Sequence, residues 1–205
     1  MSHFITLEGG EGCGKSTQAR LLYQRLKKLA VPVILIHEPG VTALGKRVTR
    51  LLKWSQDIKI SPLAELLLFN VSRAQLVEEV IKPNLEQGIN IICDRYSDST
   101  TAYQGYGRRL DLQDVKKVNS IAMQGLVPEL TILLDMPVGK GLERKNKIKP
   151  DRFQKQSQAF HERVREGFIE LAVAEPERWL VIDATKSKET IAGIIWERVS
   201  KLVKK

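Results

Sequence analysis

The feature that most constrains this chain is the stretch GGEGCGKS at residues 9–16. Its spacing matches the phosphate-binding loop G-x-x-x-x-G-K-[ST], with Gly9, Gly14, Lys15 and Ser16 at the fixed positions. The stretch follows the strand-like run HFITLE and precedes a helical pattern over residues 16–29, which is the context that this loop requires. It therefore predicts a strand, a loop and a helix that together bind the phosphates of ATP or GTP.

Within the loop, glycines let backbone amides turn inward around a phosphate while the following helix presents its positive end. We expect Lys15 to reach the β and γ phosphates and Ser16 to hold Mg²⁺. A Gly-rich turn without a ligand is the alternative, and the complete motif in its strand-helix context argues against it. The predicted ATP-binding residues are Gly9, Gly10, Glu11, Gly12, Cys13, Gly14, Lys15, Ser16 and Thr17.

Five short apolar runs alternate with longer helical patterns along the 205 residues: HFITLE, VPVILIH, NIICD, ELTILLD and WLVID. Strands separated by helices indicate a parallel sheet that is covered on both faces. We predict a single domain over residues 1–205 with a three-layer α/β/α architecture, a five-stranded parallel sheet and the P-loop nucleoside triphosphate hydrolase fold. The longest helical pattern spans 62–87, where Pro62 suits a helix start and Pro83 a kink or an end.

The formal net charge of +9 favours an anionic partner, and much of the excess lies in residues 145–152 and in the C-terminal KLVKK. Because this charge does not form a stripe interleaved with aromatic residues, a nucleotide is favoured over a nucleic acid. Cys13 and Cys93 lack the number and spacing of a disulfide framework or a zinc site. With no run of about 18 apolar residues and no leader pattern, we expect a cytoplasmic protein without a membrane partner.

A second polar group follows the strand-like run NIICD. Asp94 and Arg95 come at its end, and the carboxyl edge of a parallel sheet is where ligands bind in open α/β folds. Arg95 is suited to fork onto a second phosphate, and Asp94 to order Mg²⁺ through water. An ordinary ion pair between the two is the structural alternative.

Taken together, several motifs resemble the thymidylate kinases, which are nucleoside-monophosphate kinases of the P-loop class. The matching pieces, in the family's order, are FITLEGGEGCGKSTQ, HEPG, LLLFNVSRAQLVEEVIKP, CDRYSDSTTAYQGYGR, PELTILLD, and DRF followed by FHERVREGF. They cover nearly the whole chain. The resemblance implies that ATP donates its γ-phosphate to thymidine monophosphate (dTMP), with Mg²⁺ as the cofactor.

The resemblance also implies roles for residues of the acceptor site. Phe69 would stack on thymine, Arg73 would bind a ring carbonyl, Tyr103 would exclude a ribose 2′-hydroxyl and Glu11 would contact the 3′-hydroxyl. Judged alone, Phe69 suits the core and Arg73 a solvated helix face. The implied dTMP-binding residues are Glu11, Glu38, Arg50, Phe69, Arg73, Arg95, Thr100, Tyr103 and Gln104, of which Thr100 and Gln104 read the remaining polar edge of the base. The implied catalytic residues are Lys15, Asp94, Arg95, Arg144 and Arg152, and the implied metal residues are Ser16 and Asp94.

Residues 143–153, ERKNKIKPDRF, resemble the family's mobile lid over the donor phosphates, and Arg144 and Arg152 align with its arginines. The family usually has further arginines between them, whereas this chain has Lys145, Lys147 and Lys149, and a usual glutamate is Gln154. Which cation assists transfer is therefore open. Composition alone would favour a solvated lysine-rich loop.

The chain also departs from the family near HEPGVTALGKRVTRLL. His37, Val41 and Thr49 stand where the family commonly has arginine, glycine and arginine. We expect Arg47 or Arg50, and specifically Arg50, to contact the acceptor phosphate instead. We interpret the other histidines, His3 and His161, as surface residues of a strand and a helix.

Two alternative functions stay open from the sequence. A kinase for uridylate, adenylate or guanylate keeps the chemistry and changes the base pocket. A nucleic-acid-binding ATPase or a nucleotide-dependent switch fits the charge but lacks a recognition module. The partners implied by the resemblance are ATP, dTMP and a second copy of the chain, because family members pair through helices.

Overall fold

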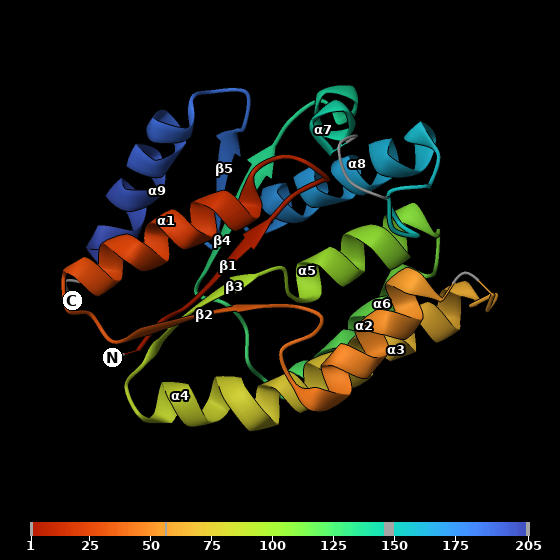
Figure 1. The fold of residues 1–205 in the computed structure, drawn as a ribbon, viewed down its shortest axis with the longest axis horizontal. Helices are drawn as coiled ribbons and strands as arrows, with labels where there is room; N and C mark the ends of the chain where they lie inside the picture. The colour runs from red at the N-terminus through yellow and green to blue at the C-terminus, as the bar shows by residue number, and fades with distance from the viewer. Residues whose placement is uncertain (1, 56, 146–149, 204–205) are drawn as a thin grey trace.

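The structure is a computed structural model that describes residues 2–55, 57–145 and 150–203. Its centre is a parallel sheet of the predicted five strands in the order β2-β3-β1-β4-β5 (Figure 1). The strands are β1 (Phe4–Glu8), β2 (Val33–His37), β3 (Asn90–Asp94), β4 (Leu130–Asp135) and β5 (Trp179–Asp183). The predicted fold class is confirmed.

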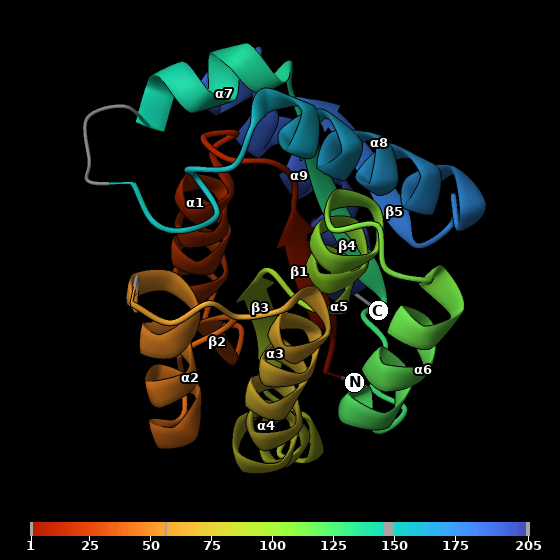
Figure 2. The ribbon, with the colours of Figure 1, turned by 90° about the vertical axis from the view of Figure 1, so that its right-hand side faces the viewer.

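Helices connect the strands in the pattern that a parallel sheet requires. They are α1 (Lys15–Lys28), α2 (Ala43–Trp54), α3 (Pro62–Leu76), α4 (Lys82–Glu86), α5 (Ser97–Thr100), α6 (Leu112–Met123), α7 (Val138–Lys145), α8 (Gln158–Ala174) and α9 (Lys188–Val203), with two π-helical segments, η1 (Val77–Ile81) and η2 (Thr101–Gly107). Figure 2 shows α7 and α8 at one end of the molecule and α2, α3, α4 and α6 at the other.

Alternation along the strands divides the core between the two faces of the sheet, because successive side chains point to opposite faces. On β1, Ile5 and Leu7 pack in the cluster that holds the apolar residues of α1 and α9. Phe4 packs in a different cluster with Leu76 at the end of α3 and with Val77 and Ile81 of η1. The sheet is therefore covered on both faces, as the apolar runs predict.

The helical pattern over 62–87 is divided into α3, η1 and α4. Ser61 caps α3 by accepting a hydrogen bond from Ala64 N–H, and Pro62 occupies its first turn. The helix type changes at Val77, and Pro83 lies in the first turn of α4. The expected break is thus a π-helical widening ahead of Pro83, whose ring nitrogen has no hydrogen to donate.

The carboxyl ends of β1 and β3 lie side by side, because Leu7 pairs with Asp94 in the parallel register. The chain leaves β1 into the residue 9–14 loop and leaves β3 into Arg95 and α5, so both predicted site segments emerge at one edge of the sheet. Among the described residues, we find no helix that combines the length and the apolar character needed to cross a membrane.

Candidate active site

The loop at residues 9–14 joins β1 to α1 as the motif predicts. Gly14 has φ 97° at the start of α1, a left-handed conformation that costs glycine little. Lys15 is buried, and its Nζ donates to the carbonyl oxygens of Gly10 at 2.6 Å and Gly9 at 3.0 Å. The ammonium group therefore lies across the loop whose backbone amides are suited to hold phosphates.

Helix α7 passes directly over this loop. A Cβ on Gly12 would lie 2.0 Å from the carbonyl oxygen of Gly141 in α7, and a Cβ on Gly141 would lie 2.2 Å from that of Glu11. Both positions must be glycine for the two backbones to approach this closely. The contact fixes where α7 ends, and therefore where Lys145 stands relative to the loop.

Ser16 and Asp94 meet at the start of α1, where the Ser16 hydroxyl donates to Asp94 Oδ2. Hydroxyl and carboxylate oxygens are the hard ligands that Mg²⁺ prefers, and few protein ligands suffice because this ion keeps several waters. These two side chains therefore fit the ion. Among the described residues, no group of three or more His, Cys, Asp or Glu is placed to hold a metal by itself.

Arg95 is held in a left-handed backbone conformation, with φ 74°, immediately after β3. Its Nη1 donates to Gly9 O at 3.0 Å and its Nη2 to Glu11 Oε1 at 3.0 Å and to Tyr103 Oη at 3.2 Å. The strained backbone is thus over-determined by the contacts of its side chain. The guanidinium stands between the phosphate loop and the hollow described below.

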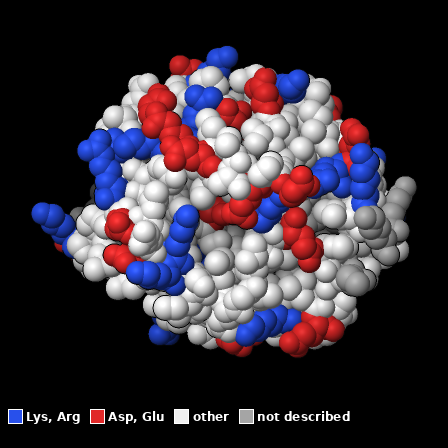
Figure 3. Space-filling view, turned by 180° about the vertical axis from the view of Figure 1, so that it is seen from behind, with Lys and Arg blue, Asp and Glu red and all other residues white. Residues whose placement is uncertain are grey.

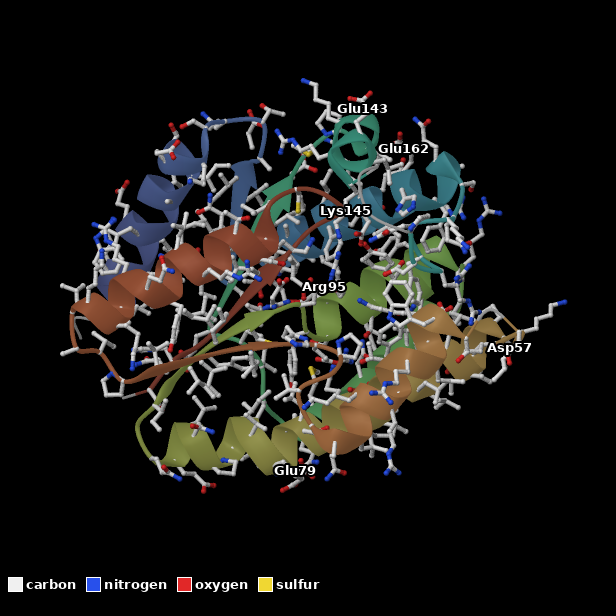
Figure 4. All side chains as sticks on the ribbon, in the orientation of Figure 1. Asp57, Glu79, Arg95, Glu143, Lys145 and Glu162 are labelled. Atoms are coloured by element: carbon white, nitrogen blue, oxygen red, sulfur yellow. The ribbon has the colours of Figure 1, made fainter. Side chains whose placement is uncertain are left out.

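Glu11 is the anion around which the cations of this region gather. Besides Arg95, it accepts from Tyr103 Oη at 3.1 Å, and Lys145 Nζ lies 3.2 Å from its Oε2. Burial would raise the pKa of Glu11, but the charges of Arg95, Lys15 and Lys145 outweigh it and hold the pKa well below its usual range. Figure 4 shows Arg95 and Lys145 toward the middle of the molecule and Glu143 on its outside.

A hollow of about 480 Å³, counting its open mouth, lies next to the loop. Eight of the nine residues expected to bind dTMP line it: Glu11, Glu38, Phe69, Arg73, Arg95, Thr100, Tyr103 and Gln104. Pro39, Lys53, Tyr96, Ser99, Asp151 and Phe153 complete the lining. Glu11 and Arg95 belong to both the hollow and the loop region, so the two predicted sites are adjacent.

Phe69 is partly buried at the edge of an aromatic cluster rather than in the middle of a core. Its ring centroid lies 5.7 Å from that of Phe153, and Tyr103 lies 6.3 Å from Phe153. An aromatic ring that lines a hollow on one side and packs on the other suits stacking against a planar base. The preference for a core residue, based on Phe69 alone, is not supported.

Arg73 is buried instead of solvated, with 1% of its surface exposed. Its Nε donates to Glu38 Oε2 at 3.1 Å, and its Nη2 lies 2.8 Å from Glu38 Oε1 without hydrogen-bond alignment. Its other protein acceptors are Asn70 Oδ1, Asn119 Oδ1, Tyr96 O and Thr100 Oγ1. Every N–H of the guanidinium faces a protein acceptor, so a base carbonyl would have to share one.

The structure does not bring Arg47 or Arg50 into the hollow, which corrects the expectation for the acceptor-phosphate contact. Both are exposed on α2, because the face of this helix that packs inward carries Val48 and Leu52. Lys53 is the α2 cation that lines the hollow. Burial, with Arg95 and Lys145 nearby, lowers the pKa of Lys53, although Asp151 and Glu11 oppose the shift.

Neither lid arginine lies where the resemblance suggests. Arg144 is exposed on α7, and the next residue, Lys145, contacts Glu11. Arg152 Nη2 donates to Ile60 O at 2.9 Å and lies 3.6 Å from Glu65 Oε2. Successive helical residues point in directions about 100° apart, so a shift of one residue moves the inward cation from Arg144 to Lys145. Lys147 and Lys149 lie outside the described residues.

Sequence reasoning misplaced one histidine and missed two carboxylates. His161 is buried on α8 rather than exposed, and it lines a smaller hollow behind the loop. Glu65 and Glu8 are completely buried beside the site, which no sequence signal identifies because each lies in an otherwise ordinary helix or strand. His3, by contrast, is partly exposed and pairs with Glu129.

A phosphate-binding loop that contributes Glu11 to an adjoining hollow, with Arg95 contacting both, defines the class: a P-loop phosphotransferase with a second hollow beside the donor loop. The family model for thymidylate kinases matches residues 7–195. The chain belongs to the thymidylate kinase family.

Known thymidylate kinases are similar to this chain over nearly its whole length. The chain is 57% identical over 204 residues to a thymidylate kinase of Dehalococcoides mccartyi strain 195, covering 100% of this chain and 99% of that one. It is 46% identical to a thymidylate kinase of Deinococcus radiodurans, covering 96% of each. It is also similar to the crystal structure of a thymidylate kinase from Ehrlichia chaffeensis, with 33% identity, a TM-score of 0.79, and coverage of 97% and 98%.

The environment of Glu8 generates a prediction about stability. Tyr96 N–H and Ser99 Oγ donate to its carboxyl group at 2.7 and 2.5 Å, yet burial and the charge of Asp98 raise its pKa from 4.5 to about 7. An acid with a raised pKa in the folded state stabilises the fold below its unfolded pKa and loses that contribution as pH rises through the folded one. Ionisation of Glu8 should therefore cost about 2 to 3 kcal/mol between pH 5 and pH 8.

We predict that Glu8→Gln, which stays neutral, becomes more stable relative to the original chain as pH rises. Urea unfolding at pH 5, 6.5 and 8 measures the difference in free energy of unfolding. Parallel pH dependences of the two proteins over this range would contradict the prediction.

Proposed function

We propose that this chain transfers the γ-phosphate of ATP to dTMP, giving ADP and dTDP. The observation that carries the proposal is the adjacency of the two sites: Glu11 and Arg95 connect the phosphate loop to a hollow lined by an aromatic ring and buried polar groups. A planar base held beside Phe69 would place its phosphate toward Arg95. Free thiols at Cys13 and Cys93 suit a cytoplasmic location.

Phosphoryl transfer requires little covalent participation by the protein, because the attacking atom is already a phosphate oxygen. What the residues supply is alignment and positive charge. Lys15 serves the donor phosphates and Arg95 serves the acceptor phosphate, and Lys145 is a lid cation that pairs with Glu11, 3.2 Å away, as Arg95 also does. Mg²⁺, held by Ser16 and Asp94, supplies neutralisation of the charge on the donor phosphates when bound.

The charge pattern on one face favours this function over nucleic-acid binding. On the face seen in Figure 3, basic and acidic side chains are interspersed, and they do not form one basic stripe. A nucleic-acid-binding ATPase would gather Lys and Arg along a groove for the phosphate backbone.

A coupled assay of ADP release tests the proposal. With ATP and Mg²⁺, we expect turnover to require a thymidine or closely related pyrimidine monophosphate and to be near background with adenosine or guanosine monophosphate. The hollow's hydrogen-bonding groups account for the difference, since they are left unpaired by the wrong base. Equal ADP release with no acceptor would overturn the proposal.

We further propose that Lys53 makes the acceptor-phosphate contact expected of Arg50. Lys53 lines the hollow together with Arg95, and its Nζ lies 3.9 Å from Asp151 Oδ2, which is too long for a hydrogen bond. The ammonium group is thus only loosely paired while it faces the same hollow as Arg95. It replaces the arginine that the family carries at the position of Thr49, one helical turn earlier on α2.

For Lys53→Met we predict a KM for dTMP raised by about 10- to 100-fold, as expected for losing a hydrogen bond to a charged group. The KM for ATP should be nearly unchanged. Arg50→Ala, on the exposed side of the same helix, is the matched control and should leave both constants unaltered. A KM for dTMP within twofold of the original in Lys53→Met would refute the assignment.

We propose that two copies pair through α3. Leu63, Leu67 and Val71 recur every four residues on this helix and are 55%, 46% and 44% exposed. An apolar stripe of this kind on a helix surface is typical of an interface with another helix, and a second copy offers the same stripe in return.

Light scattering should therefore give twice the chain mass, and Leu67→Glu should shift the protein to the monomer, because two facing carboxylates would be desolvated together. Val173→Glu, at an exposed position on α8, is the control and should stay paired. A monomeric mass for the original chain would exclude this interface.

A further inference from the structure

Thr100 and Gln104 both line the hollow. Neither side chain is restricted by its own chemistry to donating or to accepting hydrogen bonds there. A primary amide can present either its carbonyl oxygen or its NH₂ group, and a hydroxyl can either donate or accept. Whether each residue donates or accepts toward a ligand therefore depends on its hydrogen-bond partners within the protein. In this fold those partners are two buried charged side chains, Glu65 and Arg73.

Glu65 on α3 holds Gln104. Both are buried, with 0% and 1% of their surfaces exposed, and Gln104 Nε2 donates to Glu65 Oε1 at 2.9 Å. Arg108 donates from Nε and Nη2 to the two oxygens of Glu65 at 3.0 and 3.1 Å, so both oxygens act as acceptors in this contact. A carboxylate only accepts hydrogen bonds, so the nitrogen of Gln104 must face it, and the carbonyl oxygen is left for the hollow.

Arg73 fixes Thr100 in the opposite way, by donating a hydrogen bond to it. Its Nη2 donates to Thr100 Oγ1 at 2.6 Å within the buried network around Glu38. A guanidinium only donates, so Thr100 accepts at this contact and its own hydroxyl proton is directed to another acceptor. The hollow thus offers an acceptor from Gln104 and a donor from Thr100.

This pattern matches one kind of pyrimidine edge. A 4-oxo pyrimidine, such as thymine or uracil, presents a ring N–H beside a carbonyl, whereas a 4-amino pyrimidine presents a bare ring nitrogen beside an NH₂ group. We infer that Glu65 is a positioning residue that makes the site select 4-oxo over 4-amino pyrimidine monophosphates, by fixing which end of the Gln104 amide faces the base. The inference rests on the proposed function.

The test is Glu65→Gln, because a glutamine at this position can either donate or accept and frees the Gln104 amide to turn. The readout is the ratio of kcat/KM for dTMP to that for 5-methyl-2′-deoxycytidine monophosphate, which differs from dTMP only at the reading edge. We expect this ratio to fall by about tenfold or more, since the original site leaves buried polar groups unpaired against the amino base. The exposed Glu78→Gln is the matched control and should keep the original ratio.

A merely structural role for Glu65 would lower both values of kcat/KM by the same factor and leave the ratio unchanged, which would overturn the inference. Turnover of dTMP by the original chain is measured first, so that a failure of the proposed function is seen separately.

If Glu65→Gln does not fold, the original chain provides a second test. Its Gln104 side-chain NH₂ signals, labelled with ¹⁵N and assigned by their loss in Gln104→Leu, should shift little when dTMP is added, because they face Glu65. A large shift of these signals would place the NH₂ group against the base and refute the inference.

Discussion

The acceptor pocket depends on the burial of one guanidinium. Arg73 brings a positive charge into the interior between α2, α3, α5 and α6, where an unpaired charge would cost several kcal/mol. The cost is offset because its partners come from four different segments: Glu38 after β2, Asn70 on its own helix, Asn119 on α6 and Thr100 at the end of α5. Each acceptor is thereby tied to the same guanidinium, which joins the segments that line the hollow.

A negative charge, that of Glu11, organises the side chains around the phosphate-binding loop. Glu11 lies in the loop and draws in Arg95 and Lys145 from β3 and α7. A phosphate group that enters this region competes for the same cations, so Glu11 preserves their arrangement while its own contacts can be exchanged. The close packing of Gly12 on Gly141 explains why α7 delivers Lys145 to this point.

The fold and the loop could be predicted from the sequence because both depend on patterns among residues that are close together in the chain. Alternating apolar runs define the five strands, and glycine spacing with Lys15 and Ser16 defines the loop. The direction of a side chain on a helix was harder, since it changes by about 100° per residue. One such step separates Arg144 from Lys145, and a smaller turn of about 60° separates Arg50 from Lys53, three residues later.

Buried polar partners could not be predicted at all, because nothing in a helix pattern distinguishes Glu65 from a solvent-facing glutamate until α3, η2 and the segment before α8 have packed together. His161 was misplaced for the same reason. Polar residues in a helix are usually exposed, and only the tertiary contacts of α8 reverse this preference.

Glu65 also connects parts of the site that are distant in the sequence. It accepts from Gln104, which lines the hollow, and it lies 3.6 Å from Arg152, whose backbone N–H donates to Lys53 O at the end of α2. Figure 2 shows the segment before α8 passing toward α2. One carboxylate is therefore shared by Gln104 of the hollow and by the segment before α8. Arg108 donates to both oxygens of Glu65 at shorter distances than Arg152, so the hydrogen bond that orients Gln104 does not depend on Arg152 alone.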